Sequence, residues 1–429
     1  MYLNNIRHVL KYLPVVLLVL TAPYGYALNI EQAVCLAKKN LPSHKAKIIR
    51  VNSKKNLYEA SFSPYLPQLD VSGTRENLNT SSDDYDIYYY KTSLSYTLFD
   101  GGKRKSDRNI AGLNFNSSRE DYRKDLIDLY YNVKVLFFTA MSKKEILAQR
   151  RLQANDANKD YEIAKGKYQV GKALRSDVLQ ASVSFAQSKF DLRKAKGDLA
   201  KSMYDLNSFI GRPLDTGYDL ERGMDTDLYL PDKHKLINLA LETPIAVQAK
   251  NNMEISKNNV SIDKSAYYPT LSFNITYADF ETFNEVGDKS SENKSAALIA
   301  NWNLFKWDKY YKKKSSVLET SALGEELSET KRKLILEINN RHEDYTTNIE
   351  SLTLAKQQVV EAQFNYEQAS GEYNAGKGDI LSLVRAATVL SDARNLVSIS
   401  KLDFALSKAA LELTAGIENM ENMKKITVP

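Results

Sequence analysis

The sequence predicts an α+β protein of two tandem repeats, each with two β-strands and one very long helical hairpin. Two observations predict the hairpins: apolar residues recur every seven positions over residues 102–211, and the pattern returns over 307–416. A sustained seven-residue apolar repeat is typical of helices that pack side by side along a seam. A third observation, alternation of apolar and polar residues before each hairpin, predicts the strands.

The first hairpin is predicted to reverse direction near Gly171. Its outgoing arm, from Gly102 to Gly171, would be roughly 100 Å long at 1.5 Å per residue. A globular core needs no helix of that length, so we expect a rod, a stalk or the wall of a tube. The heptad positions are Leu126, Val133, Ala140, Leu147, Ala154, Tyr161 and Tyr168, then Val178, Phe185, Leu192, Leu199 and Leu206.

The second half of the chain repeats the first at a nearly constant offset. Val170-Gly171-Lys172 corresponds to Ala375-Gly376-Lys377, and Gly211 corresponds to Gly416. Because eleven heptad positions keep the same offset, the chain is predicted to be a tandem duplication. The second set of these positions is Ile338, Tyr345, Leu352, Val359, Tyr366 and Tyr373, then Leu383, Leu390, Val397, Phe404 and Leu411.

The predicted organisation follows from these patterns. Repeat 1 covers 28–211, a linking segment covers 212–234, repeat 2 covers 235–416 and a tail covers 417–429. Short helices are expected over 28–39 and 235–241, and longer ones over 43–61 and 245–265. Strands are expected at about 65–76, 87–99, 268–280 and 295–305, with polar loops over 77–86 and 281–293.

Residues 1–27 read as a secretory signal peptide. Arg7 and Lys11 precede the apolar run 13–20, and Gly25-Tyr26-Ala27 supplies small residues at the cleavage position. No later stretch of the sequence is long and apolar enough to predict a membrane-spanning helix. The chain is therefore expected to be exported, either as a soluble protein or as one that enters a membrane through its strands.

Composition argues against a nucleic-acid-binding protein, a disulfide-rich protein and an enzyme. The net charge of +6 comes from interleaved lysines and acids, which indicates a solvated surface and no nucleic-acid partner. The single cysteine, Cys35, excludes an intramolecular disulfide; we expect it to be a buried helix thiol rather than a lipid attachment point. No histidine has metal-ligand or catalytic-triad spacing, and His342-Glu343-Asp344 is interpreted as a solvated helix face. We therefore expect no enzyme, no cofactor and no metal site.

The four strands have the length and composition of transmembrane strands. Runs of about 10–12 residues cross a bilayer when tilted. Aromatic residues gather near the strand ends, as interfacial belts do. Four strands leave two open edges, and unpaired backbone groups in lipid cost several kcal/mol each. A sheet in lipid must therefore close with copies of itself: two copies would give a filled barrel, and three a possible pore. The aromatic residues are Tyr65, Tyr88, Tyr90, Tyr268, Phe280 and Trp302.

At this point the sequence resembles the TolC-type outer-membrane efflux proteins over essentially the whole mature chain. The resemblance rests on the run from Leu98 to Arg104, where strand passes into helix, and on Ser63-Pro64-Tyr65-Leu66-Pro67. It also rests on Val170-Gly171 with Ser176-Asp177-Val178-Leu179-Gln180-Ala181, and on Leu28-Asn29-Ile30-Glu31-Gln32-Ala33. The motifs occur in order and on matching heptads.

The resemblance implies a homotrimer, with a twelve-stranded barrel in the outer membrane of a Gram-negative bacterium above a twelve-helix periplasmic tunnel. It implies two further partners, a periplasmic adaptor protein and an inner-membrane transporter. The function implied is an exit duct of a tripartite efflux pump or a type I secretion system, which conducts cargo passively. The alternative is a coiled-coil structural protein of the cell envelope, which leaves the four strands unexplained.

The resemblance also assigns roles to individual residues. Those at the hairpin tips are expected to dock the adaptor: Gly171, Asp177, Val178, Leu179, Gly376, Asp379, Ile380 and Leu381. Ser382 and Arg385 fall where family members narrow the tunnel with acidic residues; neither is acidic, and Arg385 could instead pair with an acid on a neighbouring helix. Phe99, Asp100, Gly101 and Gly102 form the strand-to-helix turn.

The residue types at these turns predict how each turn is built and how the following helix is capped. Glycines suit the sharp strand-to-helix turn and the left-handed helix ends at both tips. Lys306-Trp307-Asp308 replaces the glycines in repeat 2, so that turn must be built differently. Asp379 is expected to cap the following helix. Leu174, at the matching position of repeat 1, has no side-chain acceptor, so Ser176 is predicted to serve there.

Overall fold

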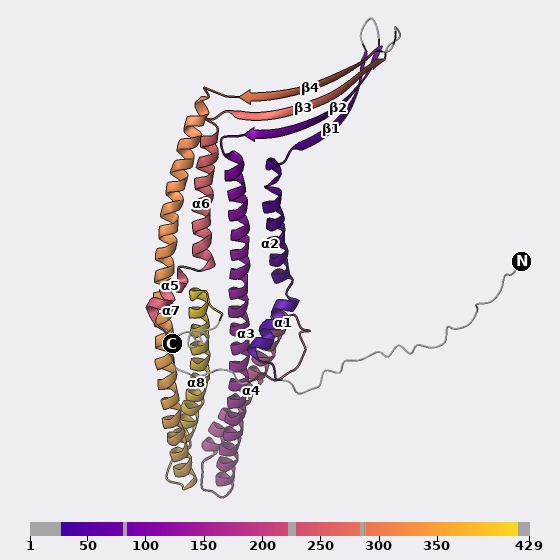
Figure 1. The fold of residues 1–429 in the computed structure, drawn as a ribbon. Helices are drawn as coiled ribbons and strands as arrows, with labels where there is room; N and C mark the ends of the chain where they lie inside the picture. The colour runs from indigo at the N-terminus through magenta and orange to yellow at the C-terminus, as the bar shows by residue number, and fades with distance from the viewer. Residues whose placement is uncertain (1–26, 80–83, 222–228, 284–286, 288, 419–429) are drawn as a thin grey trace, which may run out of the picture.

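A computed structural model describes residues 27–79, 84–221, 229–283, 287 and 289–418. The predicted signal peptide therefore lies outside the described residues, apart from Ala27. The molecule is elongated: long helices run side by side, and a four-stranded sheet extends from one end of them (Figure 1). In the described part of the chain, no helix is both long and apolar enough to span a bilayer.

Each half contains two short helices followed by a long hairpin. The first half has α1 (Ile30–Asn40), α2 (Pro42–Ala60), α3 (Lys103–Gln169) and α4 (Arg175–Ile210). The second half has α5 (Lys233–Ala240), α6 (Pro244–Ser265), α7 (Trp307–Asn374) and α8 (Ile380–Ala415). At 67 residues, α3 is roughly 100 Å long, as its sequence predicts.

The strands form one antiparallel sheet in the order β1-β2-β3-β4. They are β1 (Gln68–Asn79), β2 (Asp84–Phe99), β3 (Thr270–Phe283) and β4 (Lys289–Asn301). The β2–β3 pair joins the two repeats, with Leu94 opposite Ile275. Strands β1 and β4 lie at the two edges, and each pairs on one side only.

The predicted strand limits need correction at both ends of the sheet. Ser63–Tyr65 forms a 3-10 helix with Pro64 in its first turn, so β1 begins three residues later than predicted. Strand β4 stops at Asn301 because its partner β3 begins at Thr270, directly after Pro269, which has no N–H to extend the ladder. The predicted extension to Phe305 is therefore wrong.

The strands also reach further into the expected loops than predicted. Strand β3 continues to Phe283 and β4 starts at Lys289, where the sequence suggested a polar loop over 281–293. Likewise, β1 and β2 pair from Gln68↔Ser95 as far as Asn79↔Asp84. Backbone ladders do not require apolar side chains, so pairing continues where alternation has ended.

Heptad residues fill the seam of the second hairpin. Ile338, Tyr345 and Leu352 on α7 are buried, as are Phe404 and Leu411 on α8. The rings of Tyr345 and Phe404 stack with centroids 5.5 Å apart. The seam predicted from the seven-residue spacing is thus confirmed for this hairpin.

Polar contacts bind the two halves at mid-height, where α1 and α5 pack against the long helices. Buried Lys134 on α3 donates to Glu412 on α8 at 2.5 Å and to the Glu418 carbonyl at 2.7 Å. In repeat 1, buried Asn207 occupies the position that matches Glu412, and its amide donates to the carbonyls of Leu214 and Thr216. A buried polar side chain thus binds the segment that follows each hairpin: Asn207 after the first, and Lys134 of the first repeat after the second.

Two predictions near the N-terminus are wrong. Leu28 lies before α1 and bridges Leu220, so the helix begins at Ile30, after Asn29 caps it through the Gln32 N–H. Cys35 is exposed rather than buried, because α1 turns Ala33, Val34 and Ala37 toward the core.

Candidate functional site

The two hairpin turns lie together at the end of the molecule opposite the sheet (Figure 1). Gly171 has φ of 73° and Gly376 has φ of 75°, which confirms the left-handed helix ends. No atom lies within 4 Å of the place that a side chain would occupy at either glycine. Backbone conformation, rather than space, therefore selects glycine here.

The helices that leave the turns are capped by aspartates. Asp379 accepts from the Ser382 N–H at 2.8 Å and from its hydroxyl at 2.9 Å, and these bonds hold the pKa of Asp379 below its usual value. In repeat 1, Asp177 reaches back and accepts from the Leu174 N–H at 3.0 Å. The prediction that Ser176 caps this helix is wrong, because an acid at the third helical position can reach back to that N–H.

The tip surface is apolar where the predicted docking residues lie. Leu179 and Leu381 are 57% and 45% exposed. Val170 and Leu174, which were not among the predicted docking residues, are also exposed. Val170 and Leu174 lie in the turn between α3 and α4, where no helix seam can bury them. An apolar residue in an exposed turn therefore indicates a partner surface, and the sequence could have identified both residues in this way.

One predicted docking residue belongs to the interior instead. Ile380 is 7% exposed and packs in a cluster to which all four long helices contribute, so it cannot form part of the outer surface. Lys167 on α3 donates to the Tyr373 carbonyl on α7, and its ammonium lies 4.2 Å from the Tyr373 ring centroid. The cluster consists of Ala164, Ala181, Tyr373, Ile380 and Leu383.

Above the tip, a buried carboxyl lies between the two hairpins. Asp160 on α3 is buried and accepts from the Tyr366 hydroxyl on α7 at 3.4 Å. Burial, and then the nearby charge of Asp156, raise the pKa of Asp160 to about 6. Asp156 itself lies 3.8 Å from Arg394 on α8.

The two residues predicted to line a constriction are both exposed near the start of α8. The hydroxyl of Ser382 is engaged by Asp379, so it belongs to the helix cap. Within the described residues of this single chain, Arg385 has no acid within 4 Å.

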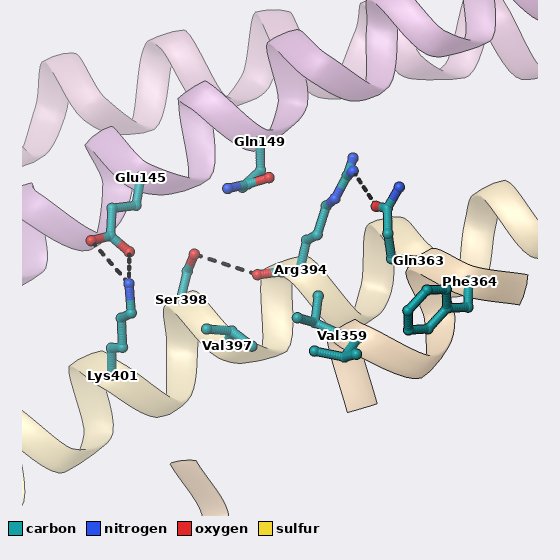
Figure 2. A pocket seen from close by; sticks show the side chains of 10 residues that line it. Glu145, Gln149, Val359, Gln363, Phe364, Arg394, Val397, Ser398 and Lys401 are labelled. Atoms are coloured by element: carbon teal, nitrogen blue, oxygen red, sulfur yellow. Dashed lines mark hydrogen bonds and ion pairs between the residues drawn. The ribbon is translucent and has the colours of Figure 1, made fainter. Parts of the chain in front are cut away.

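A groove of about 380 Å³ runs over α8 between α3 and α7 (Figure 2). Glu145 on α3 pairs with Lys401 on α8 at 3.2 Å at one side of it. Arg394 donates to Gln363 on α7 at 2.8 Å at the other side. The remaining lining residues are Gln149, Val359, Val360, Phe364, Val397 and Ser398.

At the other end of α3, the predicted strand-to-helix turn is compact. Phe99 ends β2, and Gly101 and Gly102 have φ of 66° and 90°. Asp100 accepts from the Gly102 and Arg104 N–H groups and pairs with the Arg104 guanidinium at 2.9 Å. In repeat 2, Lys306 has φ of −152°, which confirms that this turn is built differently.

Comparison with known proteins identifies the family. The family model described as outer membrane efflux protein matches residues 34–212 and 236–416. The two matched ranges cover both hairpins and both pairs of strands. The chain therefore belongs to the outer membrane efflux protein family, whose members are channel proteins rather than enzymes.

Individual relatives are distant in sequence but close in fold. The chain is 19% identical to outer membrane protein TolC of Salmonella enteritidis over 382 residues, covering 84% of this chain and 76% of TolC. It resembles the crystal structure of CusC with a TM-score of 0.80 at 14% identity, covering 90% of this chain and 92% of CusC. The Campylobacter jejuni CmeC outer membrane channel matches with a TM-score of 0.75 at 18% identity, covering 92% and 88%.

Proposed function

We propose that three copies of this chain assemble into an outer-membrane channel that serves as the exit duct of a tripartite pump or a type I secretion system. The observation that carries the proposal is the sheet, whose edge strands β1 and β4 each pair on one side only. In a bilayer, these open edges would cost several kcal/mol per unpaired group, so the sheet must close with other copies.

Three copies give a barrel wide enough for a pore. Each chain supplies four strands, so two copies give an eight-stranded barrel that side chains fill, whereas three give twelve strands and room for a pore. Below the barrel, the four long helices of each copy would form the wall of a periplasmic tunnel. The family places the chain in the outer membrane of a Gram-negative bacterium.

Mass and extraction behaviour test this assembly. The detergent-extracted protein is expected to have the mass of three chains and to shift to the single-chain position in electrophoresis after heating. An envelope rod would stay soluble without detergent and would show no such shift. That result would overturn the proposal in favour of the structural alternative.

The tip is proposed to dock a periplasmic adaptor protein that connects the duct to an inner-membrane transporter. Exposed Leu179 and Leu381 support this role, since apolar side chains on an exposed tip favour a partner surface. Gly171 and Gly376 shape the turns, while Asp177 and Asp379 cap the helix starts and Val178 lies half-buried beside Leu179. Ile380 supports the surface from behind.

Charged substitutions at the tip test the docking role. Leu179→Glu with Leu381→Glu is expected to abolish adaptor-dependent export in cells, because burial of either carboxylate opposes docking. The purified variant should retain wild-type conductance, since neither side chain belongs to the interior cluster. Unchanged export in cells would contradict the assignment.

Arg385 is proposed to line the narrow part of the tunnel, with Ser382 beside it. Both residues are exposed, and no acid lies near enough to neutralise Arg385 among the described residues. Three guanidinium groups around one axis would attract anions and repel cations. The cargo itself is decided by the transporter and adaptor that the duct serves.

A further inference from the structure

Basic side chains gather where the sheet meets the long helices. Residues 306–314, between the end of β4 and the third turn of α7, read Lys-Trp-Asp-Lys-Tyr-Tyr-Lys-Lys-Lys (Figure 1). Five lysines against one aspartate give this short segment a charge of +4. In repeat 1, Lys103 and Lys105 are exposed at the start of α3, directly after the end of β2. Both strand-to-helix connections are therefore basic.

The two basic segments lie at one level, on either side of the end of α6. A side chain on Gly101 would come within 2.7 Å of the Ser265 carbonyl, so the start of α3 lies against the last residue of α6. The ammonium groups of Lys309 and Lys313 lie 6.0 and 5.7 Å from the ring centroid of Tyr267, just after α6. We call these lysines the basic band: Lys103, Lys105, Lys306, Lys309, Lys312, Lys313 and Lys314.

Most of the charge in the second segment is not neutralised by its own acid. Asp308 is shared by two lysines, with Lys306 at 3.5 Å and Lys312 at 2.8 Å. Within the described part of the chain, Lys313 and Lys314 have no acid within 4 Å. The band therefore attracts anions at a fixed height on the molecule.

Exposed aromatic rings share the face of the band on α7. Trp307, Tyr310 and Tyr311 are 69%, 58% and 52% exposed. Tyr311 contacts both other rings, with centroids 5.8 Å and 5.2 Å apart. Lys314 lies seven residues after Trp307 and is therefore on the same side of the helix. Rings and a lysine on one exposed face are typical of a membrane interface, where the rings lie among the head groups and the ammonium reaches phosphate.

The sheet places this face at the depth of the lipid head groups. Its apolar side continues to the end nearest the helices, where Phe273 lies opposite Leu298 and Leu271 opposite Ala300. Tilted by about 45°, the 13 residues of β4 span roughly 30 Å, the thickness of a hydrocarbon core. The first eight residues of α7 then cover roughly 12 Å, which is within reach of the head groups.

We propose that the basic band binds the phosphate groups of anionic phospholipids in the leaflet next to the helices. The proposal rests on the proposed function, because the band meets lipid only if the sheet lies in a bilayer; that leaflet is then the periplasmic one. Lys313 and Lys314 contact the phosphates, while Trp307 and Tyr311 lie among the head groups. Binding enriches anionic lipid around the channel and fixes its depth in the membrane.

Tryptophan fluorescence tests the proposal at the site itself. The sequence contains two tryptophans, Trp302 and Trp307, so Trp302→Phe leaves Trp307 as the only reporter. The protein is reconstituted in vesicles of phosphatidylcholine with a minor fraction of phosphatidylglycerol, and one of the two lipids carries bromine on its upper acyl chain. Quenching by brominated phosphatidylglycerol is expected to indicate a local fraction about fivefold above its bulk fraction, the preference contributed by one lysine near an anionic surface.

Neutral variants identify the lysines responsible. Lys313→Gln with Lys314→Gln should bring the local fraction of phosphatidylglycerol close to its bulk value, and so should high salt with the wild-type lysines. Lys331→Gln with Lys356→Gln is the matched control, because both lysines are exposed on α7 but lie at least 17 residues, or roughly 26 Å, beyond Lys314. Enrichment that survives in the Lys313 and Lys314 variant would overturn their assignment.

The proposal and the channel fail differently in this experiment. Quenching by both lipids in proportion to their bulk fractions would leave an aromatic belt and overturn the phosphate site. Quenching by neither lipid, in a protein that conducts, would place Trp307 inside the channel or against another copy and would overturn the site as well. A protein that stays monomeric and does not enter the vesicles would overturn the proposed function itself.

Discussion

Protonation of Asp160 affects the packing of the two hairpins, because this carboxyl is buried between α3 and α7. It ionises in the unfolded chain near its ordinary pKa of 3.8, but in the folded protein only near pH 6, because of burial and the charge of Asp156. Between these values the folded state binds more protons than the unfolded state, so the free energy of unfolding falls as pH rises. The stabilising effect is complete below about pH 4 and lost above about pH 6.

Removing this carboxyl should therefore flatten the pH profile. We expect Asp160→Asn to lose the fall in thermal stability that the wild type shows between pH 4 and pH 6, a difference on the order of 3 kcal/mol at neutral pH. Thermal unfolding in detergent across this range measures it. Glu162→Gln, at an exposed position on the same helix, is the control. An unchanged slope in Asp160→Asn would show that another group is responsible.

Arg385 is the residue at which ion selectivity should respond. Arg385→Asp replaces three positive charges around the proposed tunnel axis with three negative ones, and selectivity should move toward cations. Arg385→Lys keeps the charge and should keep the wild-type selectivity. Reversal potentials in a salt gradient measure the change. Identical reversal potentials for the wild type and both variants would show that Arg385 does not line the tunnel.

Among the elements, the turn between β2 and α3 depends most strictly on its glycines. A side chain on Gly101 would come within 2.7 Å of the Ser265 carbonyl, whereas one on Gly102 would meet nothing within 4 Å. Both glycines have a left-handed backbone conformation. Alanine at either position should therefore lower the free energy of unfolding by roughly 1–2 kcal/mol through backbone strain alone. Gly101→Ala carries the additional clash.

The matched pair of variants separates these two costs. Gly101→Ala should lower the yield of assembled protein and its melting temperature more than Gly102→Ala does. The comparison is direct because the residues are adjacent and the substitution is the same. Equal losses in the two variants would show that the close approach to Ser265 does not limit folding.

Element types were more predictable from sequence than their ends. Seven-residue and two-residue periodicities predicted the long helices and the strands, because each spacing follows from the geometry of its element. The end of β4 was mispredicted because it depends on where β3 begins, at Thr270. The cap of α4 was mispredicted because Asp177, inside the helix, competes with Ser176 for the free N–H groups.

Contacts between distant residues lay beyond sequence reasoning. Asp160 and Tyr366 are separated by 206 positions, and each occupies an ordinary position in its own helix. The same holds for Lys134 and Glu412, which join the two halves at mid-height. Periodicity shows that a helix has a packing face, but the identity of the facing residue depends on the relative height of two hairpins.

At the scale of the whole molecule, duplication produced one layer of helices and one sheet from two similar halves. The halves meet inside the chain, through β2–β3 and through α3–α8. The corresponding outer parts, β1 and α4 at one side and β4 and α7 at the other, remain available to other copies. In the proposed channel, these edges are closed by the neighbouring copies.

Single-channel recording tests this central claim most directly. The detergent-purified protein without residues 1–27 should insert into planar lipid bilayers and give stable, discrete conductance steps, while its mass in the same detergent is that of three chains. Conduction requires the sheet to be closed and the helices to enclose a continuous passage. A protein that remains monomeric and soluble without detergent, and that leaves bilayer conductance unchanged, would contradict the account.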